Sequence, residues 1–264
     1  MSPFFSSLIS GVFIGGAAGY LGTLMLSRRM ALVADPLGHL ALPGIALALL
    51  WNLDVSIGAF PFVILGVVLI WMLERKTGLP TEALTAVIFA SGVATAFLFL
   101  PMEQAEAALV GDVSRVGSLG AALSVVASLA TVLVLWRTYP QLILGNISEE
   151  LAAAEGISVE RYNLLYLFLI AVIVALGVKM VGGLLTAALV AIPPSAARNL
   201  GRSLRQYTLG ATSIGAASAA LGVVLSRITG FPAGPLIILV SAAVFLLTVP
   251  FARHRVGSAS TMRA

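Results

Sequence analysis

Two side chains near the start of the second long apolar stretch have the types and the spacing of a functional site. Asp35 and His39 are four residues apart, and positions i and i+4 of a helix share one face, so both side chains can point at the same ligand. Ionisable groups within a membrane span cost roughly 2.5–3.5 kcal/mol each and usually face a pore or a partner. The pair is therefore a candidate functional site. A structural role is the alternative, because Asp35 also suits the N-cap position of a helix whose first residue is Pro36.

The composition is that of a polytopic membrane protein. Of the 264 residues, 59% are hydrophobic and only 10% are charged, whereas soluble domains carry about 25% charged residues. No polar linker divides the chain, so we expect a single all-α transmembrane helical bundle. The absence of cysteine excludes disulfides, thiolate metal sites and cysteine nucleophiles. The basic residues are scattered at the ends of the apolar stretches and form no patch, which argues against a nucleic-acid partner.

Nine apolar stretches approach the length needed to cross about 30 Å of hydrocarbon. Eight spans with one re-entrant segment are the alternative, because only Lys179 and the Gly182-Gly183 bend separate the sixth stretch from the seventh. With nine crossings and an outside N-terminus, three of the fifteen basic residues lie outside, which fits the positive-inside rule. The stretches are residues 4–27, 36–53, 55–73, 82–100, 116–136, 162–178, 180–197, 207–226 and 231–251.

Small residues at four-residue spacing indicate how some of these helices pack. Gly11, Gly15 and Gly19 share one face of the first stretch. Small faces let helices approach closely in lipid, so we expect this face to pack against another helix.

Two prolines or proline pairs interrupt other stretches. Pro43 and Gly44 lie early in the second stretch, and Pro193 and Pro194 lie late in the seventh. A proline removes a backbone hydrogen bond, and broken backbone at membrane depth is tolerated where it is buried or lines a cavity. Both interruptions are candidate gating points, with a plain packing kink as the alternative for each.

A polar segment between the fifth and sixth stretches predicts a short helix. Its sequence is NISEELAAAEGISVER, in which Ser148 suits an N-cap, Glu149 and Glu150 suit the first turn, and Gly156 suits a C-terminal stop. A helix of about eight residues is not stable alone in water. We therefore expect it to be braced on the bundle or docked in a groove of a partner.

The chain lacks the motifs of the enzymes that an integral membrane protein of this kind could resemble. No P-loop pattern is present, so this chain does not hydrolyse ATP even if ATP drives transport. No GxSxG pattern is present, and His39 is the only histidine in an apolar stretch. We therefore expect no enzymatic activity.

Three segments together resemble one family. The segment RRMALVADPLGHLALPGIALA resembles the early signature of permease subunits of bacterial zinc, manganese and iron importers driven by ATP-binding cassettes. SEELAAAEGISVERYNLLYL resembles the cytoplasmic segment of that family that contacts the ATPase, and KMVGGLLTAALVAIPPSAARNL with TGFPAGPLIILV resembles its C-terminal half. Asp35 and His39 match the family pattern, whereas Ala34, Pro36 and Gly38 replace its usual glycine, alanine and serine.

The resemblance implies a type II importer-like permease in the bacterial cytoplasmic (inner) membrane. It implies one multi-pass transmembrane domain over residues 1–264, with a coupling segment at about 146–160 and a tail at about 252–264. Its expected partners are a second copy of itself, a cytoplasmic ATP-binding-cassette ATPase that hydrolyses the ATP, an extracytoplasmic metal-binding protein and membrane lipid. The residues that would contact the ATPase are Glu149, Glu150, Leu151, Glu155 and Gly156.

The same resemblance implies that Asp35 and His39 contact the transported ion. A carboxylate with an imidazole suits zinc, manganese or ferrous iron without distinguishing among them. Two copies of the pair near a two-fold axis would give up to four ligands, and we expect no stably bound cofactor. The alternative is an ion-coupled secondary transporter or channel that uses the same pair. That alternative predicts uptake without an ATPase and inverted repeats, and we see no clear repeat.

Overall fold

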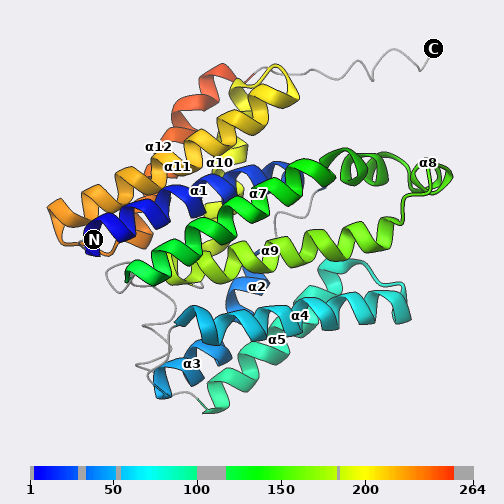
Figure 1. The fold of residues 1–264 in the computed structure, drawn as a ribbon, viewed down its shortest axis with the longest axis horizontal. Coiled ribbons are helices and arrows are strands. Elements are labelled where there is room, and N and C mark those ends of the chain that lie inside the picture. The colour runs from blue at the N-terminus through cyan, green and yellow to red at the C-terminus, as the bar shows by residue number, and fades with distance from the viewer. Residues whose placement is uncertain (1–2, 29–33, 52–54, 100–116, 183–184, 253–264) are drawn as a thin grey trace.

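The computed structural model describes residues 3–28, 34–51, 55–99, 117–182 and 185–252, and every regular element within these ranges is a helix (Figure 1). The predicted all-α fold class is therefore confirmed. In chain order the elements are α1 (Pro3–Ser27), α2 (Ala34–Leu40), α3 (Leu42–Leu50), α4 (Val55–Thr77), α5 (Thr81–Phe99), α7 (Ser118–Ile147), α8 (Glu149–Ala154), α9 (Val159–Val181), α10 (Thr186–Leu200), α11 (Leu204–Thr229), α12 (Ala233–Thr248) and the 3-10 helix η3 (Val249–Phe251).

The prediction of nine spans, or of eight, is not supported. In the described part of the chain, six helical segments are long and apolar enough to cross a membrane: Phe4–Ser27, Gly58–Thr77, Ser118–Ile147, Val159–Val178, Leu204–Thr229 and Ala233–Phe251.

Two of the nine apolar stretches form helices that are too short to cross a membrane. The stretch 36–53 is broken into α2 and α3, of 7 and 9 residues. The stretch 180–197 forms α10, whose 15 residues rise only about 22 Å. The stretch 82–100 forms α5, of 19 residues, which is not among these six segments. The orientation inferred from nine crossings loses its basis, while a multi-pass membrane protein remains.

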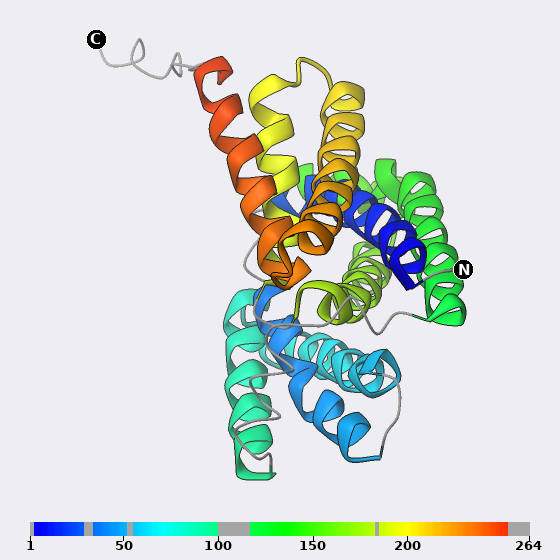
Figure 2. The ribbon, with the colours of Figure 1, turned by 90° about the vertical axis from the view of Figure 1, so that its left-hand side faces the viewer.

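Helix α1 lies within the larger of two helix groups. It contacts α7, α9, α10 and α11. The smaller group contains α3, α4 and α5, and α2 lies between the two groups (Figure 2). Helix α2 contacts α4 and α5 of the smaller group and α9 and α10 of the larger one. The segment with the candidate acid and imidazole is therefore placed where the two groups meet.

The glycine face of α1 packs against α11, as the spacing predicted. A Cβ atom on Gly15 would collide with the carbonyl of Gly215, and a Cβ on Gly19 would collide with the carbonyl of Ala211. These are contacts between two backbones. Glycine at these positions is what lets the helices approach so closely.

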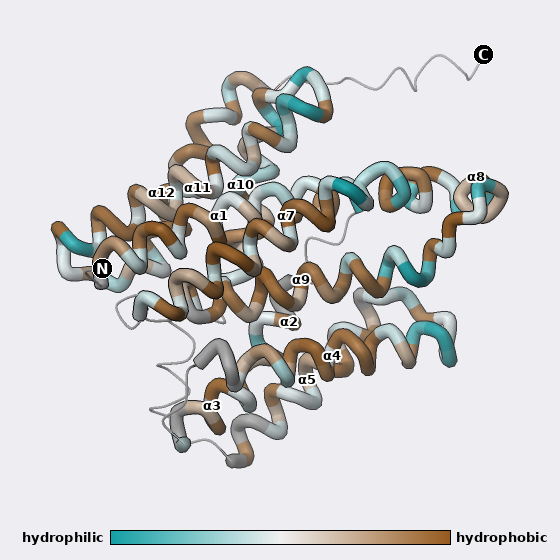
Figure 3. The backbone as a smooth tube through the Cα atoms, in the orientation of Figure 1, coloured by the Kyte–Doolittle hydropathy of each residue, from teal (hydrophilic) through white to brown (hydrophobic). Residues whose placement is uncertain are grey.

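Polar residues gather at the helix ends around α8, the α4–α5 turn and the α10–α11 turn, whereas apolar residues dominate the middle of the bundle (Figure 3). Helix α8 and the α4–α5 turn lie at the same end of the molecule, opposite the N-terminus and the α11–α12 turn (Figure 1). This distribution is expected of a bundle whose middle lies in hydrocarbon.

Candidate functional site

Both members of the candidate acid–imidazole pair belong to α2. Asp35 and His39 are separated by one helical turn, although the side chain of Asp35 lies outside the part that the structure describes. The ring of His39 is partly buried and meets the ring of Phe89 on α5 edge to face, with 5.2 Å between centroids and an interplanar angle of 80°. Phe89 was missed in the sequence, because nothing local connects it with α2.

The C-terminal end of α2 is held by a slot on the smaller helix group. Leu40 is buried. A Cβ atom on Gly66 of α4 would lie 2.6 Å from its Cδ1, and a Cβ on Gly92 of α5 would lie 2.6 Å from its Cδ2. We call this the Leu40 slot, formed by Gly66 and Gly92. It holds the residue next to His39 on the helix.

The break between α2 and α3 coincides with one predicted gating point. Pro43 has no N–H to donate to the carbonyl of His39, so the regular helical bond between these residues cannot form. The chain re-enters a helix at once, with the N–H of Ile45 donating to the carbonyl of Ala41 at 2.9 Å. Gly44 then lies against the backbone of Gly58 on α4. Pro43 and Gly44 thus end one short helix and attach the next to α4.

The second predicted gating point lies inside α10. Pro193 and Pro194 are both buried within this helix. Because Pro194 has no N–H, the carbonyl of Val190 receives no regular helical bond. A Cβ atom on Gly22 of α1 would collide with this same carbonyl. The proline pair therefore turns irregular backbone toward α1.

The predicted short helix of the coupling segment is present as α8. The Oγ of Ser148 accepts a hydrogen bond from the N–H of Leu151 at 3.2 Å, which is the expected N-cap. Gly156 has a positive φ of 73° and its N–H donates to the carbonyl of Ala153 at 3.0 Å. The local structure that Ser148 and Gly156 predicted is confirmed.

Helix α8 is braced on the bundle yet leaves apolar surface uncovered. Ala152 is buried and α8 contacts α7 and α9. Ile147 is 73% exposed and Leu151 is 51% exposed at the polar end of the molecule. Glu149, Glu150 and Glu155 are exposed as well. The segment therefore combines a fixed base with an open, partly apolar and acidic surface.

An arginine at the end of α1 connects this segment to the bundle, and sequence reasoning missed its role. The Nη1 of Arg28 donates to the Oδ1 of Asn163 on α9 at 2.7 Å, and its Nη2 donates to the carbonyl of Leu142 on α7 at 2.9 Å. Its guanidinium lies 5.3 Å from the ring centroid of Tyr166. Burial lowers the pKa of Arg28, and Tyr166 opposes the shift. Arginine stays charged even so, so its hydrogen bonds are charge-assisted.

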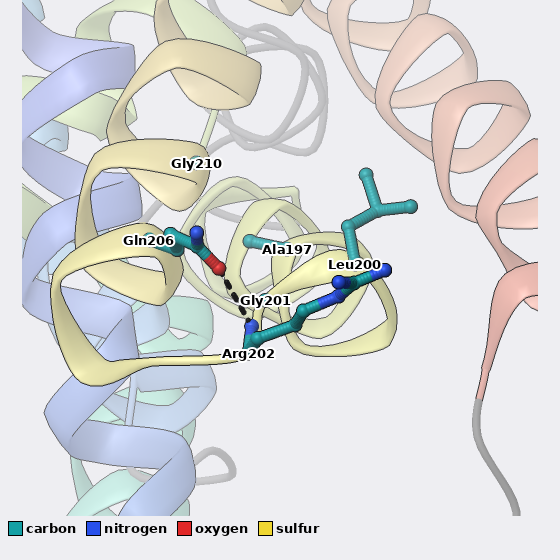
Figure 4. Close-up of a pocket in the computed structure, with 6 residues that line it drawn as sticks. All are labelled: Ala197, Leu200, Gly201, Arg202, Gln206 and Gly210. Atoms are coloured by element: carbon teal, nitrogen blue, oxygen red, sulfur yellow. Dashed lines mark hydrogen bonds between the residues drawn. The ribbon is translucent and has the colours of Figure 1, made fainter.

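Two hollows lie at the polar helix ends. A groove of about 410 Å³ runs between the α4–α5 turn and the start of α8, and Arg28, Glu74 and Glu149 are among the residues that line it. A second pocket of about 350 Å³ lies at the α10–α11 turn, where the Oε1 of Gln206 accepts from the N–H of Arg202 at 3.0 Å (Figure 4). Of the predicted site residues, Glu149 lines the first hollow, and none lines the second.

No group of three or more histidine and acidic side chains that could hold a metal occurs among the described residues. At α2, one chain therefore contributes two candidate metal ligands, His39 and, by its position in the helix, Asp35.

Both the sequence and the structure of this chain resemble known proteins over nearly its whole length. The sequence model of the family described as "ABC 3 transport family" matches residues 2–252. The chain is 26% identical over 247 residues to the manganese import system permease protein ScaB of Streptococcus gordonii. The alignment covers 92% of this chain and 89% of that protein. The chain is 28% identical over 260 residues to the high-affinity zinc uptake system membrane protein ZnuB of Haemophilus influenzae, with 95% and 98% covered.

Among solved structures, PsaBC from Streptococcus pneumoniae in complex with Fab contains a similar chain. The TM-score is 0.80 at 25% identity, over 94% of this chain and 91% of that one. The similarity therefore extends over nearly the whole fold.

Proposed function

Because this chain belongs to the ABC 3 transport family, we infer that it is the membrane-spanning permease subunit of an ATP-binding-cassette importer for a divalent transition metal ion. The family resemblance carried by the three sequence motifs is thereby confirmed. The two relatives compared above are named for manganese and for zinc, so we propose these ions as the cargo ahead of iron. The observation that carries the proposal is the position of α2, the helix that contains Asp35 and His39, which contacts both helix groups.

In this proposal Asp35 and His39 contact the ion as it crosses. A carboxylate oxygen and an imidazole nitrogen suit both zinc and manganese. One chain supplies two such ligands at α2, so a second copy across a two-fold axis would raise the number to four. An incomplete shell is useful to a transporter, because the ion must be bound strongly enough to enter and weakly enough to leave.

The test is metal uptake by Asp35→Ala and His39→Ala variants of the complete importer. Both are expected to reduce manganese or zinc uptake to background while the permease still accumulates in the membrane. Arg205→Gln is the control, since it removes a charge from an exposed side chain of α11, outside both α2 and the coupling segment. Normal uptake by both α2 variants would defeat the assignment of these ligands.

We further propose that residues 146–160 dock on a cytoplasmic ATPase. The exposed side chains of Ile147 and Leu151 support this, because apolar groups at the polar end of a bundle gain from being covered by a partner. Glu149, Glu150 and Glu155 would give the contact an acidic rim. Helix α8 would then move with the ATPase and rock the helices that flank it.

Co-purification of the ATPase with a Leu151→Asp variant tests this contact. A charge on the apolar surface is expected to release the ATPase, while the variant permease still elutes as a folded protein. Ala154→Ser is the control, because Ala154 is exposed on the same helix and the change adds only a small uncharged hydroxyl group. Full retention of the ATPase by Leu151→Asp would contradict the docking site.

Pro43, Gly44, Pro193 and Pro194 remain proposed gating positions. Their support is that Pro43 separates α2 from α3 and that Pro194 leaves the Val190 carbonyl out of the regular helical bonding pattern. Pro194→Ala would restore a helical donor, and we expect slower metal uptake with the complex intact. Unchanged uptake would favour a plain packing kink.

A further inference from the structure

Arg28 joins three helices, because it extends α1 and its side chain contacts α7 and α9. It extends the last turn of α1, since its N–H donates to the carbonyl of Leu24 at 2.9 Å. Its guanidinium donates to α9 through Asn163 and to α7 through Leu142. These are the two helices that flank α8. A single residue therefore holds both arms of the hairpin that presents the coupling segment.

A second contact strengthens the same connection. The phenol of Tyr166 on α9 is fully buried and donates to the carbonyl of Leu21 on α1 at 3.2 Å, while its ring lies beside the guanidinium of Arg28. Planar guanidinium groups combine stacking on a ring with a rigid fork of donors, which a lysine ammonium cannot reproduce. The residue type is therefore matched to this arrangement.

At the polar end of the molecule, the polar contact between the hairpin and the other helix group is weaker, although α4 also packs against α9. Arg75 of α4 lies 3.7 Å from Glu160 of α9, and the two side chains are 53% and 65% exposed. Ion pairs between exposed side chains contribute little to the stability of the folded protein. The groove lined by Arg28, Glu74 and Glu149 also separates the start of α8 from the α4–α5 turn. The polar contacts at this end therefore join the hairpin to α1 more firmly than to α4.

The end of α1 leads directly to the proposed metal segment. Arg28 is six residue steps from Ala34, the first residue of α2, a distance along the chain of at most about 22 Å. A displacement of the α7–α9 hairpin that carries the end of α1 with it therefore also acts on α2. We propose that Arg28 is the positioning residue that couples movement of α8 to the segment carrying Asp35 and His39. This inference rests on the proposed function of the chain as an importer permease.

The test uses the complete importer in proteoliposomes and compares metal transported with ATP hydrolysed. Arg28→Gln is expected to keep the complex assembled and its basal ATPase activity unchanged, while the number of ions moved per ATP falls about ten-fold, which is in the range of typical coupling effects. Arg28→Lys is expected to recover part of the ratio. A role limited to stability would lower transport and hydrolysis together and leave the ratio as it was.

Arg75→Gln is the matched control, because it removes an arginine that contacts the same end of α9 from α4. It is expected to leave the ratio unchanged. An unaltered ratio in Arg28→Gln, or an equal loss in Arg75→Gln, would overturn the inference.

Asn163→Ala decides the matter if Arg28→Gln does not assemble. It removes one acceptor of Arg28 and leaves the charge in place, and it should lower the ratio in the same direction by a smaller factor. An unchanged ratio in this variant would overturn the inference as well. Failure of the proposed function is a different result: the wild-type complex would then move no metal or bind no ATPase.

Discussion

Helices α1 and α2 are both positioned by glycines, but in opposite ways. On α1, Gly15 and Gly19 admit the backbone of α11, so the contact joins two main chains. Around α2, the glycines belong to the neighbouring helices, and Gly66 and Gly92 admit the side chain of Leu40. A main-chain contact can change only if a whole helix moves. A side chain in a slot can change rotamer, so the α2 contact can adjust where the α1 contact cannot.

This difference fits the roles proposed for the two helices. A rigid contact between α1 and α11 gives the larger group a fixed frame. In the proposed mechanism, the adjustable Leu40 slot would let α2 shift slightly as an ion passes. The two regions should therefore respond oppositely to mutation: α1 should be sensitive to added atoms, and α2 should be more sensitive to atoms removed.

The largest effect is expected for Gly19→Ala. Its new Cβ would collide with the carbonyl of Ala211, which no rotamer change can relieve. We expect a loss of about 3 kcal/mol in stability, at the upper end of the cost of overpacking. The loss of stability is measured by heating the detergent-solubilised protein and monitoring its unfolding by size-exclusion chromatography.

Gly16→Ala is the control for that change, because it adds the same methyl group to the same helix. Its Cβ would lie 3.5 Å from the Cγ2 of Thr212, which is ordinary van der Waals contact. We expect a stability close to that of the unchanged protein. Equal unfolding temperatures for Gly16→Ala and Gly19→Ala would show that the α1–α11 contact is not the rigid one.

Leu40→Ala is expected to have the next largest effect. Removing this buried side chain empties the slot between Gly66 and Gly92. The two glycines have no side chains that could fill the space. Leucine-to-alanine changes in cores cost about 2–5 kcal/mol, and we expect about 2 kcal/mol because a seven-residue helix can shift to close part of the cavity. The same unfolding measurement applies, and a loss larger than that of Gly19→Ala would reverse the ranking of the two regions.

The part of this architecture that sequence could predict is the part encoded locally. Helix α8 was predicted with its cap and its stop because Ser148 and Gly156 act within one turn. The bend after α9 was also visible, and Gly182 has a φ of 82° there. The face of α1 was visible in the spacing of its glycines, although the helix that covers it was not.

Contacts between distant residues account for what sequence reasoning missed. Arg28 and Asn163 are 135 residues apart, and no local signal joins them. The second apolar stretch was predicted as one span, because hydrophobicity alone does not show where a helix breaks. Pro43 marked the interruption, but the contact of Gly44 with Gly58 on α4 had no local signal in the sequence.

The smallest effect is expected for Gly92→Ala, and it separates the two regions most sharply. The new Cβ would lie 2.6 Å from the Cδ2 of Leu40, but the end of this side chain can turn away. We expect a loss of about 1 kcal/mol in stability, at the low end of the cost of overpacking, together with a larger relative change in metal uptake, because His39 is the next residue to Leu40.

The double variant Gly92→Ala with Leu40→Ala tests whether the two residues share one slot. The added methyl occupies space that the shortened side chain has left, so the combined loss in stability should be smaller than the sum of the two single losses. Residues in contact typically show coupling of about 0.5–3 kcal/mol, whereas independent sites add. Strict additivity would mean that Leu40 is held elsewhere, and α2 would then have no adjustable contact to set against the rigid one of α1.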